Sequence, residues 1–162
     1  MRRLIVVLAV FALFVAGAVP ALSANSAKNF RTHLTGAEEV PAVETQAQGQ
    51  AIFKLSADGT ELRYKLIVAN IENVLMAHIH LGEAGENGPV VVWLYPDGPP
   101  PQLIEGRFQG VLAEGVITDA DLVGPLAGAT MEDLLAEIEA GNAYVNVHTA
   151  QFPGGEVRGQ IR

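Results

Sequence analysis

The sequence predicts an all-β protein: an antiparallel β-sandwich of the Greek-key type, with one short helical insert near residues 130–140. Three observations lead to this prediction. Apolar and polar residues alternate with a period of two along most of the chain, as they do in half-buried strands. The alternating stretches are short and recur at regular intervals. Gly, Pro, Asn and Asp separate them, which is typical of sandwiches and barrels.

Three strands are expected in the first part of the chain. Alternation predicts a first strand over 30–35, and the segment 36–41, which contains Gly and Pro, ends it. A second strand is predicted over 50–55 and a third over 62–68. The Asp-Gly dipeptide at 58–59 lies between them and tolerates the positive φ angles of a tight hairpin turn. The second and third strands should therefore pair antiparallel.

The middle of the chain should add three or four more strands. A fourth strand is predicted over 74–81, followed by a Gly-rich loop over 82–89. Residues 90–95 are nearly all apolar, which indicates a strand at the centre of the sandwich that is buried on both faces. The segment 96–101 is rich in Pro and cannot continue a sheet, because Pro donates no backbone hydrogen bond. Residues 106–117 should form one or two weaker strands.

One segment follows a helical rather than a strand pattern. Apolar residues at helical spacing predict a short amphipathic helix over 131–140. Thr130 precedes it as an N-cap, with Asp133 three residues on, and Gly141 fits the position just past its end. We expect its apolar stripe to cover one edge or end of the sandwich. Two final strands are expected over 143–148 and 156–161, joined by a turn over 152–155.

The first 24 residues do not belong to this fold. Arg2 and Arg3 precede an almost unbroken apolar run over 4–18, and small residues lead up to Ala24. This order is typical of a secretory signal peptide. A permanent membrane anchor is the alternative, but a spanning helix needs about 20 apolar residues and the run is shorter. We therefore expect a signal peptide over 1–24, a single domain over 25–162, and export to the periplasm or the extracellular space.

The mature chain should be strongly acidic. The whole sequence has a formal charge of −8, and loss of the two leader arginines lowers it by two, to −10. Such a chain is a poor partner for nucleic acid and for anionic lipid. The sequence contains no Cys, which excludes thiol chemistry and leaves burial alone to hold the domain together. We expect no nucleic-acid partner and no stable membrane insertion after leader cleavage.

Three of the four histidines form the most informative pattern. His78 and His80 are two residues apart on a predicted strand, so both imidazoles lie on the same face. His148 lies near the end of the penultimate strand. If the two strands are neighbours, the three imidazoles converge and offer a ligand set suited to copper or zinc. The alternative is structural, because a buried imidazole can instead bind backbone carbonyls and fix a loop.

Other candidate chemistry is thin. No Ser of the mature chain lies in a G-x-S-x-G motif. The pair Glu38 and Glu39 lacks the aromatic groove that a glycosidase needs. His33 lies on the polar side of the first strand, and Trp93 is expected in the core. We therefore expect a protein without enzymatic activity, and a hydrolase is kept only as a remote alternative.

Three segments of the chain, in order, resemble the signatures of one family. They are 34–41 (LTGAEEVP), 77–82 with 87–92 (AHIHLG and NGPVVV), and 141–149 with 153–161 (GNAYVNVHT and PGGEVRGQI). Together they resemble the CHRD (chordin-repeat) domain over about residues 29–162. The signature positions that we single out as structural are Glu39, Pro41, Gly88, Asn146 and Arg158. A carboxylate–guanidinium contact between Glu39 and Arg158 would join the first loop to the last strand.

The resemblance implies location and fold more firmly than activity. The family occurs as repeats in animal chordin, an extracellular antagonist that binds growth factors of the bone-morphogenetic class. It also occurs as stand-alone exported proteins in bacteria, and a lone domain with this leader looks like the second type. The implied function is an extracytoplasmic binding or interaction module whose partner is an unknown protein or surface ligand. The loops over 82–89, 96–101 and 152–155 are candidate contact surfaces.

A second, looser resemblance concerns the histidines. An H-x-H strand, a Gly-containing loop and a His on the penultimate strand are similar to the copper site of copper–zinc superoxide dismutase, which is also a β-sandwich. The resemblance implies His78, His80 and His148 as copper-type ligands, in an immunoglobulin-like or dismutase-like sandwich. The loop over 82–89 contains no bridging His, and there is no disulfide. Dismutase activity is therefore not implied. The alternative function is a protein that binds copper or zinc, including a redox-active form.

Overall fold

The computed structural model describes residues 28–162. The predicted signal peptide over 1–24 lies outside the described residues. In the part of the chain that is described, no helix combines the length and apolar character needed to cross a membrane.

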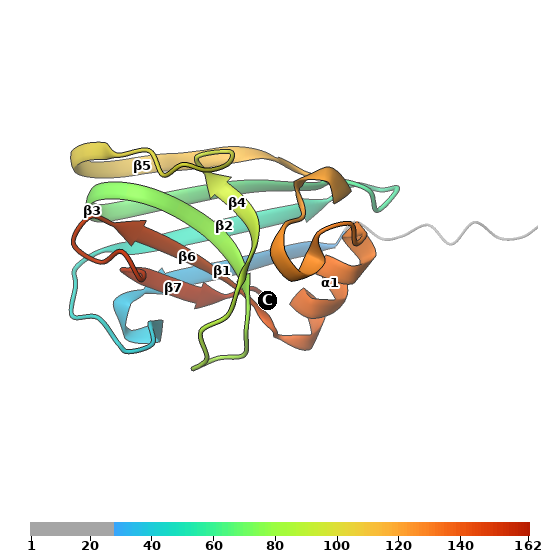
Figure 1. The fold of residues 1–162 in the computed structure, drawn as a ribbon, viewed down its shortest axis with the longest axis horizontal. Helices are drawn as coiled ribbons and strands as arrows, with labels where there is room; N and C mark the ends of the chain where they lie inside the picture. Colours follow the sequence, from blue (N-terminus) through green and yellow to red (C-terminus); the bar gives the residue numbers. More distant parts are fainter. Residues whose placement is uncertain (1–27) are drawn as a thin grey trace, which may run out of the picture.

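The all-β class is confirmed, because seven strands and one short α-helix make up the described fold (Figure 1). The strands are β1 (Asn29–Thr35), β2 (Gln48–Leu55), β3 (Leu62–Leu81), β4 (Val90–Tyr95), β5 (Ile104–Ile117), β6 (Ala143–Thr149) and β7 (Val157–Gln160). Three single 3-10 turns, η1 (Gly36–Glu38), η2 (Asp119–Asp121) and η3 (Gly124–Leu126), and the helix α1 (Met131–Ala140) complete it. Most expected strands lie within a residue or two of their predicted positions.

The arrangement of the strands differs from the predicted sandwich. All seven belong to one sheet with the order β2-β1-β7-β6-β3-β4, and β5 pairs with β3. β2 also pairs with β3, so the path returns to its start and the sheet closes into a barrel-like arrangement. The predicted antiparallel pairing of the second and third strands is present, from Gln48 opposite Ala69 to Leu55 opposite Leu62.

The closure depends on one long, bent strand. The sequence predicted two strands, over 62–68 and 74–81, but the structure has a single β3 from Leu62 to Leu81. Asn70 and Asn73 have φ angles of 55° and 53°, and the register shifts around them. Asn tolerates this left-handed conformation, so the chain bends here without ending the strand. One half of β3 pairs with β2 and β5, and the other half pairs mainly with β4 and β6.

The apolar strand over 90–95 was predicted at the centre of the sandwich, but it lies at an edge of the sheet. Within the described residues β4 pairs only with β3, and the turn η3 packs against it. The backbone N–H of Val123 donates to Val91 at 2.9 Å, and Leu122 and Leu126 are buried. This covering explains the apolar sequence of an edge strand. The weak pattern over 106–117 is a single edge strand, β5, whose outer residues are largely exposed.

The helix forms where it was predicted. The Thr130 and Asp133 side chains and backbone groups satisfy one another as a capping box, and Gly141 ends the helix with a φ of 82°. Met131, Leu134, Leu135 and Ile138 are the buried stripe. The helix lies at one end of the closed sheet, next to β6 (Figure 1). It closes that end of the core, as expected of an apolar stripe at this spacing.

Candidate functional site

The outer side of the β3–β6–β7 sheet is polar and yet buried. Period-two alternation places Ala143, Val145 and Val147 of β6 in the apolar core, and it places the intervening residues on the opposite side. Cross-strand pairing aligns His78 with Asn146 and Arg158, and His80 with Tyr144 and Gln160. We call this set the polar face. Its members are His78, His80, Tyr144, Asn146, His148, Arg158 and Gln160.

Three loops cover the polar face, and its side chains hold them in place. The Gln160 side-chain amide donates to the Gly82 carbonyl at 3.0 Å, at the start of loop 82–89. The Asn87 amide in that loop donates to the Val40 carbonyl at 2.7 Å, which joins it to the segment after η1. Nδ1 of His148 lies 3.0 Å from the Pro153 carbonyl, in the third loop, over 152–155. The loops and the face beneath them therefore form one hydrogen-bonded unit.

The structure brings the three predicted histidines together. One ring nitrogen from each of His78, His80 and His148 lies within 4.8 Å of those of the other two. The shortest contact joins Nδ1 of His78 to Nε2 of His148 at 3.2 Å. The three residues are only 2, 8 and 6% exposed. His33 is exposed on β1, as predicted from its alternation.

The hydrogen bonds assign the protons on two of these rings. Nδ1 of His80 lies 2.9 Å from the Gly88 carbonyl, and Nδ1 of His148 lies 3.0 Å from the Pro153 carbonyl. Because a carbonyl can only accept, Nδ1 of each ring carries the proton and Nε2 keeps its lone pair. His78 then donates from Nδ1 to His148 Nε2. The Nε2 atoms of His78 and His80 are buried and have no hydrogen-bond partner in the described structure.

Burial keeps all three rings neutral at physiological pH. Burial, together with the neighbouring imidazoles, lowers the pKa of His78 to about 3 and that of His148 to about 4. The pKa of His80 is also lowered, chiefly by burial, although its bond to Gly88 opposes the shift. The cluster therefore offers unprotonated lone pairs, which is the form of imidazole that binds a metal ion.

Two aromatic side chains frame the cluster. The ring of Trp93 meets that of His78 edge to face, with centroids 4.2 Å apart. Tyr144 stacks on His80, with centroids 4.9 Å apart and planes 10° from parallel. Trp93 was expected in the core, but it is only partly buried. The contact between Trp93 and His78 could have been predicted from the sequence, because a strand paired with the H-x-H strand places some of its side chains beside the histidines.

Arg158 is fully enclosed at the other end of the polar face. Its guanidinium lies 3.5 Å from the centroid of the Tyr144 ring, and it donates to the Asn87 side chain at 3.2 Å and the Glu83 carbonyl at 2.9 Å. The predicted direct contact with Glu39 is not formed: no ion pair joins the two among the described residues. Asn87 was not predicted, although it lies in the loop that both charged residues approach.

Glu39 binds Asn146 instead. Its two carboxyl oxygens lie 2.9 and 3.0 Å from Nδ2 of Asn146, while Oδ1 of Asn146 is buried without a partner. Burial raises the pKa of Glu39 to about 7, although Asn146 and the charge of Arg158 oppose the shift. A protonated Glu39 could donate its O–H to the otherwise unpaired Oδ1. Gly155 packs closely against this pair, because an added Cβ there would lie 2.6 Å from the Asn146 amide and 2.7 Å from Oε1 of Glu39.

The other signature residues act through the backbone. The peptide bond between Val40 and Pro41 is cis, in the covering segment that follows η1. Gly88 lies so close to β3 that an added Cβ would be 1.5 Å from the Leu81 carbonyl oxygen. No other residue fits there without moving the loop that binds His80. The signature residues therefore build the polar face and the loops that cover it.

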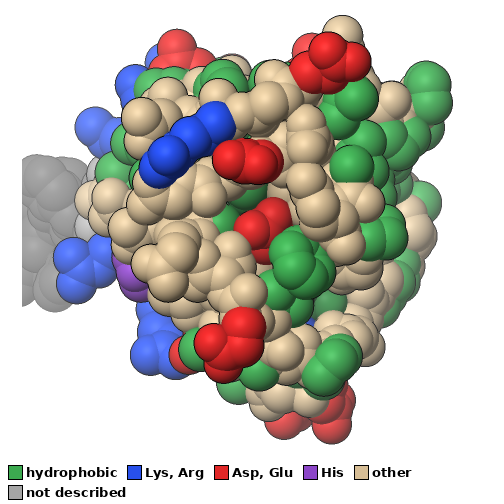
Figure 2. Space-filling model, turned by 90° about the vertical axis from the view of Figure 1, so that its left-hand side faces the viewer, with side chains coloured by type: hydrophobic (Ala, Val, Ile, Leu, Met, Phe, Trp, Pro, Cys, Tyr) green, Lys and Arg blue, Asp and Glu red, His purple; other side chains and the backbone are tan. Residues whose placement is uncertain are grey.

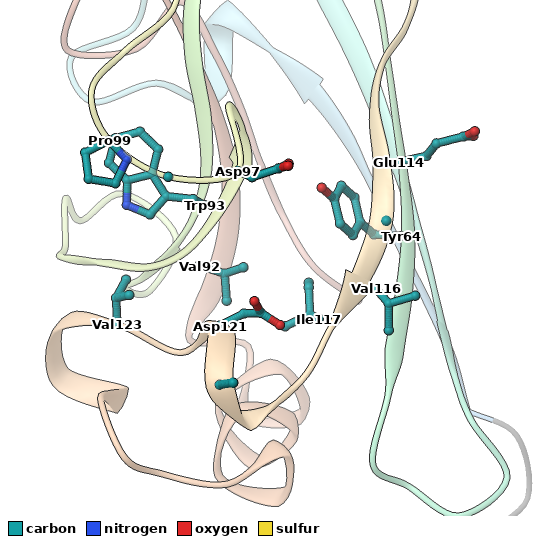
Figure 3. Close-up of a pocket in the computed structure, with 13 residues that line it drawn as sticks. Tyr64, Val92, Trp93, Asp97, Pro99, Glu114, Val116, Ile117, Asp121 and Val123 are labelled. Atoms are coloured by element: carbon teal, nitrogen blue, oxygen red, sulfur yellow. The ribbon is translucent and has the colours of Figure 1, made fainter.

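A separate pocket of about 690 Å³ opens between β4, β5 and the η2 turn (Figure 3). Tyr64, Trp93, Asp97, Glu114 and Asp121 are among its lining residues. Burial, together with the charges of Asp97 and Asp121, raises the pKa of Tyr64 to about 12, and its hydroxyl donates to the Leu94 carbonyl at 3.0 Å. The pocket thus combines aromatic and acidic groups, and Trp93 belongs both to it and to the surroundings of His78.

The end of the molecule that carries loop 149–156 presents both acidic and basic side chains (Figure 2). One acidic side chain is set within a hollow of this face. A hollow of about 270 Å³ here is lined by Glu72, Phe152 and Glu156 among others. Glu156 is held inside by hydrogen bonds from Thr45 at 2.7 Å and Thr149 at 2.8 Å. Its role is structural, because both hydroxyls satisfy the buried carboxylate.

Comparisons with known proteins place these segments in one family. The sequence matches the model of the CHRD domain over residues 30–161. It is 31% identical over 136 residues to chordin from Xenopus laevis, which covers 79% of this chain and 12% of chordin. The chain therefore spans only a small part of that relative. No solved structure matches it.

We predict that Gly88→Ala destabilises the fold by about 3 kcal/mol or prevents folding, since the new methyl group collides with the backbone of β3. Gly98→Ala is the matched control, because no atom lies within 4 Å of its added Cβ. Urea unfolding followed by far-ultraviolet circular dichroism measures both. Equal midpoints for the two variants would contradict the close approach at Gly88.

We predict that Glu39→Gln becomes more stable relative to the parent as pH rises from about 5 to 8. The folded pKa of about 7 lies above the usual value of 4.5 for this carboxyl group, so the native state holds the extra proton and loses stability when it leaves. The gain should be about 2 kcal/mol after allowance for solvent screening. Urea midpoints across this pH range measure it, with the exposed Glu38→Gln as control. A pH-independent difference would show that Glu39 is ionised throughout.

Proposed function

The chain belongs to the CHRD domain family, and we propose that it acts outside the cytoplasm as an exported binding module. The leader pattern of residues 1–24 supports export. The observation that supports binding is the polar face, which fixes the covering loops to one scaffold. Loops that are held in this way present a preformed surface, and a preformed surface loses little entropy on binding.

The charge of the covering loops suggests the kind of partner. Glu38 is exposed at the end of η1, and Glu83 and Glu86 are exposed in loop 82–89. These groups add to the strongly acidic balance of the whole chain. A complementary partner would carry basic groups, since like charges opposed across an interface are unfavourable. The proposed ligand is therefore an extracytoplasmic protein or surface polymer with a basic contact region.

We expect a photo-crosslinking residue at Glu86 to capture a partner in living cells of the source organism. The adduct should be recovered from the extracytoplasmic fraction. The matched control is the same residue at Asp58, in the exposed β2–β3 turn. Adducts of equal yield at both positions, or adducts found only in the cytoplasm, would argue against a loop-mediated module outside the cell.

Metal binding is the second candidate function, and the histidine cluster favours it. Three neutral imidazoles converge, and two of their buried nitrogens have no partner. Such nitrogens are costly to bury unless something binds them. His80 and His148 also donate their other ring N–H groups to backbone carbonyls, which is how metal-ligating histidines are usually oriented. The cluster would hold copper or zinc.

We predict that one equivalent of copper or zinc changes the fluorescence of Trp93, the only Trp in the chain, because its ring touches His78. Titration of purified mature protein, with elemental analysis of the dialysed product, measures the stoichiometry. His80→Ala should lose the response, and the exposed His33→Ala should keep it. If a folded His80→Ala protein binds metal as well as the parent, the cluster is purely structural. In that case His148→Ala would lower only the thermal stability in metal-free buffer.

A further inference from the structure

The histidine cluster differs from most metal sites in the charge that its residues supply. Among the described residues, His78, His80 and His148 form a group that could hold a metal ion. This group contains no carboxylate. All three ligands are neutral. An ion bound here would bring its full charge into a buried place, because no ligand of the set offsets it.

On the basis of the metal site proposed above, we propose that the cluster is selective for monovalent copper, Cu(I), over Zn²⁺ and Cu²⁺. The cost of burying an ion rises steeply with its charge, and it is repaid only by opposite charge or strong ligation nearby. A monovalent ion in a neutral, buried ligand set incurs much less of this cost than a divalent ion.

The wider surroundings add to the preference for low charge. A cation lies close by, because the guanidinium of Arg158 lies on the Tyr144 ring and that ring stacks on His80. Glu39 could offset this charge, but its carboxyl group is bound to Asn146 rather than to the cluster. A dication would meet this positive field with twice the charge of Cu(I).

The geometry favours an ion of low coordination number. With metal–nitrogen bonds of ~2 Å, the 3.2 Å between His78 Nδ1 and His148 Nε2 corresponds to an angle of about 105° at a shared ion. The third nitrogen lies within 4.8 Å of the other two, so it must approach by up to ~1.3 Å to reach the ~3.5 Å that separates the ligands of a trigonal ion. His78 can shift its proton to Nε2 to free Nδ1. The burial of all three residues leaves little room for the water that a three-histidine zinc site would add.

The half-buried Met76 provides a soft group on the same face. It lies two residues before His78 and is paired across the sheet with His148. Thioether sulfur prefers Cu(I) over the harder divalent ions. Within the described residues, Met76 is the only thioether on the second half of β3, and a soft group at this position would support cuprous rather than zinc binding.

The test is a direct competition on the mature protein. Cu(I) is supplied anaerobically with ascorbate and buffered by bicinchoninate, and bound copper and zinc are counted by elemental analysis. We expect one Cu(I) per chain to remain in the presence of ~100-fold excess Zn²⁺, and Cu²⁺ to bind at least ~100-fold more weakly. Displacement by an equal concentration of Zn²⁺ would overturn the selectivity and leave the metal site intact. Failure of every metal to bind would instead overturn the site itself.

A change of ligand charge gives an independent test. His80→Asp adds one negative charge to the set, so Zn²⁺ should gain at least ~10-fold relative to Cu(I). Met76→Leu should weaken Cu(I) binding without strengthening Zn²⁺. The exposed His33→Asp is the control for added negative charge elsewhere. An unchanged Zn²⁺/Cu(I) ratio in a folded His80→Asp protein would show that ligand charge does not set the preference.

Discussion

All seven residues of β6 are buried, so the polar side chains on its outer side lie where water cannot satisfy them. This constraint organises the functional half of the molecule. Buried polar groups must find partners within the protein. Tyr144, Asn146 and His148 find them in the loops that cover the sheet, and each loop is held by a hydrogen bond from β6, β7 or a neighbouring loop. The polar face and the loops thus depend on each other. The core on the other side of β6 needs only apolar packing.

The bend of β3 makes this arrangement possible. Its first half closes the sheet with β2, and its second half carries His78 and His80 alongside β6. A straight strand of this length would extend beyond the sheet, because each residue adds about 3.3 Å. The two Asn residues with positive φ allow the strand to turn while it keeps its pairing on both sides. The position of the histidines beside His148 is therefore a consequence of the closed sheet.

Local patterns in the sequence predicted most of the elements, and long-range contacts account for the failures. The helix over 131–140 was predicted correctly because its caps and its apolar spacing are local. The interruption inferred between 68 and 74 was wrong, since Asn residues that usually end a strand only bend it here. The pairing of Glu39 with Asn146 rather than Arg158 depends on how a loop folds over the sheet. The convergence of His78, His80 and His148 could be suggested by face and spacing, but it required β3 and β6 to be neighbours.

The unpaired nitrogens of the cluster are best understood against the rest of the polar face. Arg158 and Gln160 lie in the same network, and their amide and guanidinium groups meet several acceptors each. A sheet that satisfies the hydrogen-bond donors of Arg158 and Gln160 could also have placed donors beside His78 and His80. Their Nε2 atoms are instead buried with no hydrogen-bond partner among the described residues. Asn146 Oδ1 is the third unpaired atom, and protonation of Glu39 would satisfy it. A cation bound to the cluster would engage the lone pair of His80 Nε2, to which no hydrogen bond is made within the described residues.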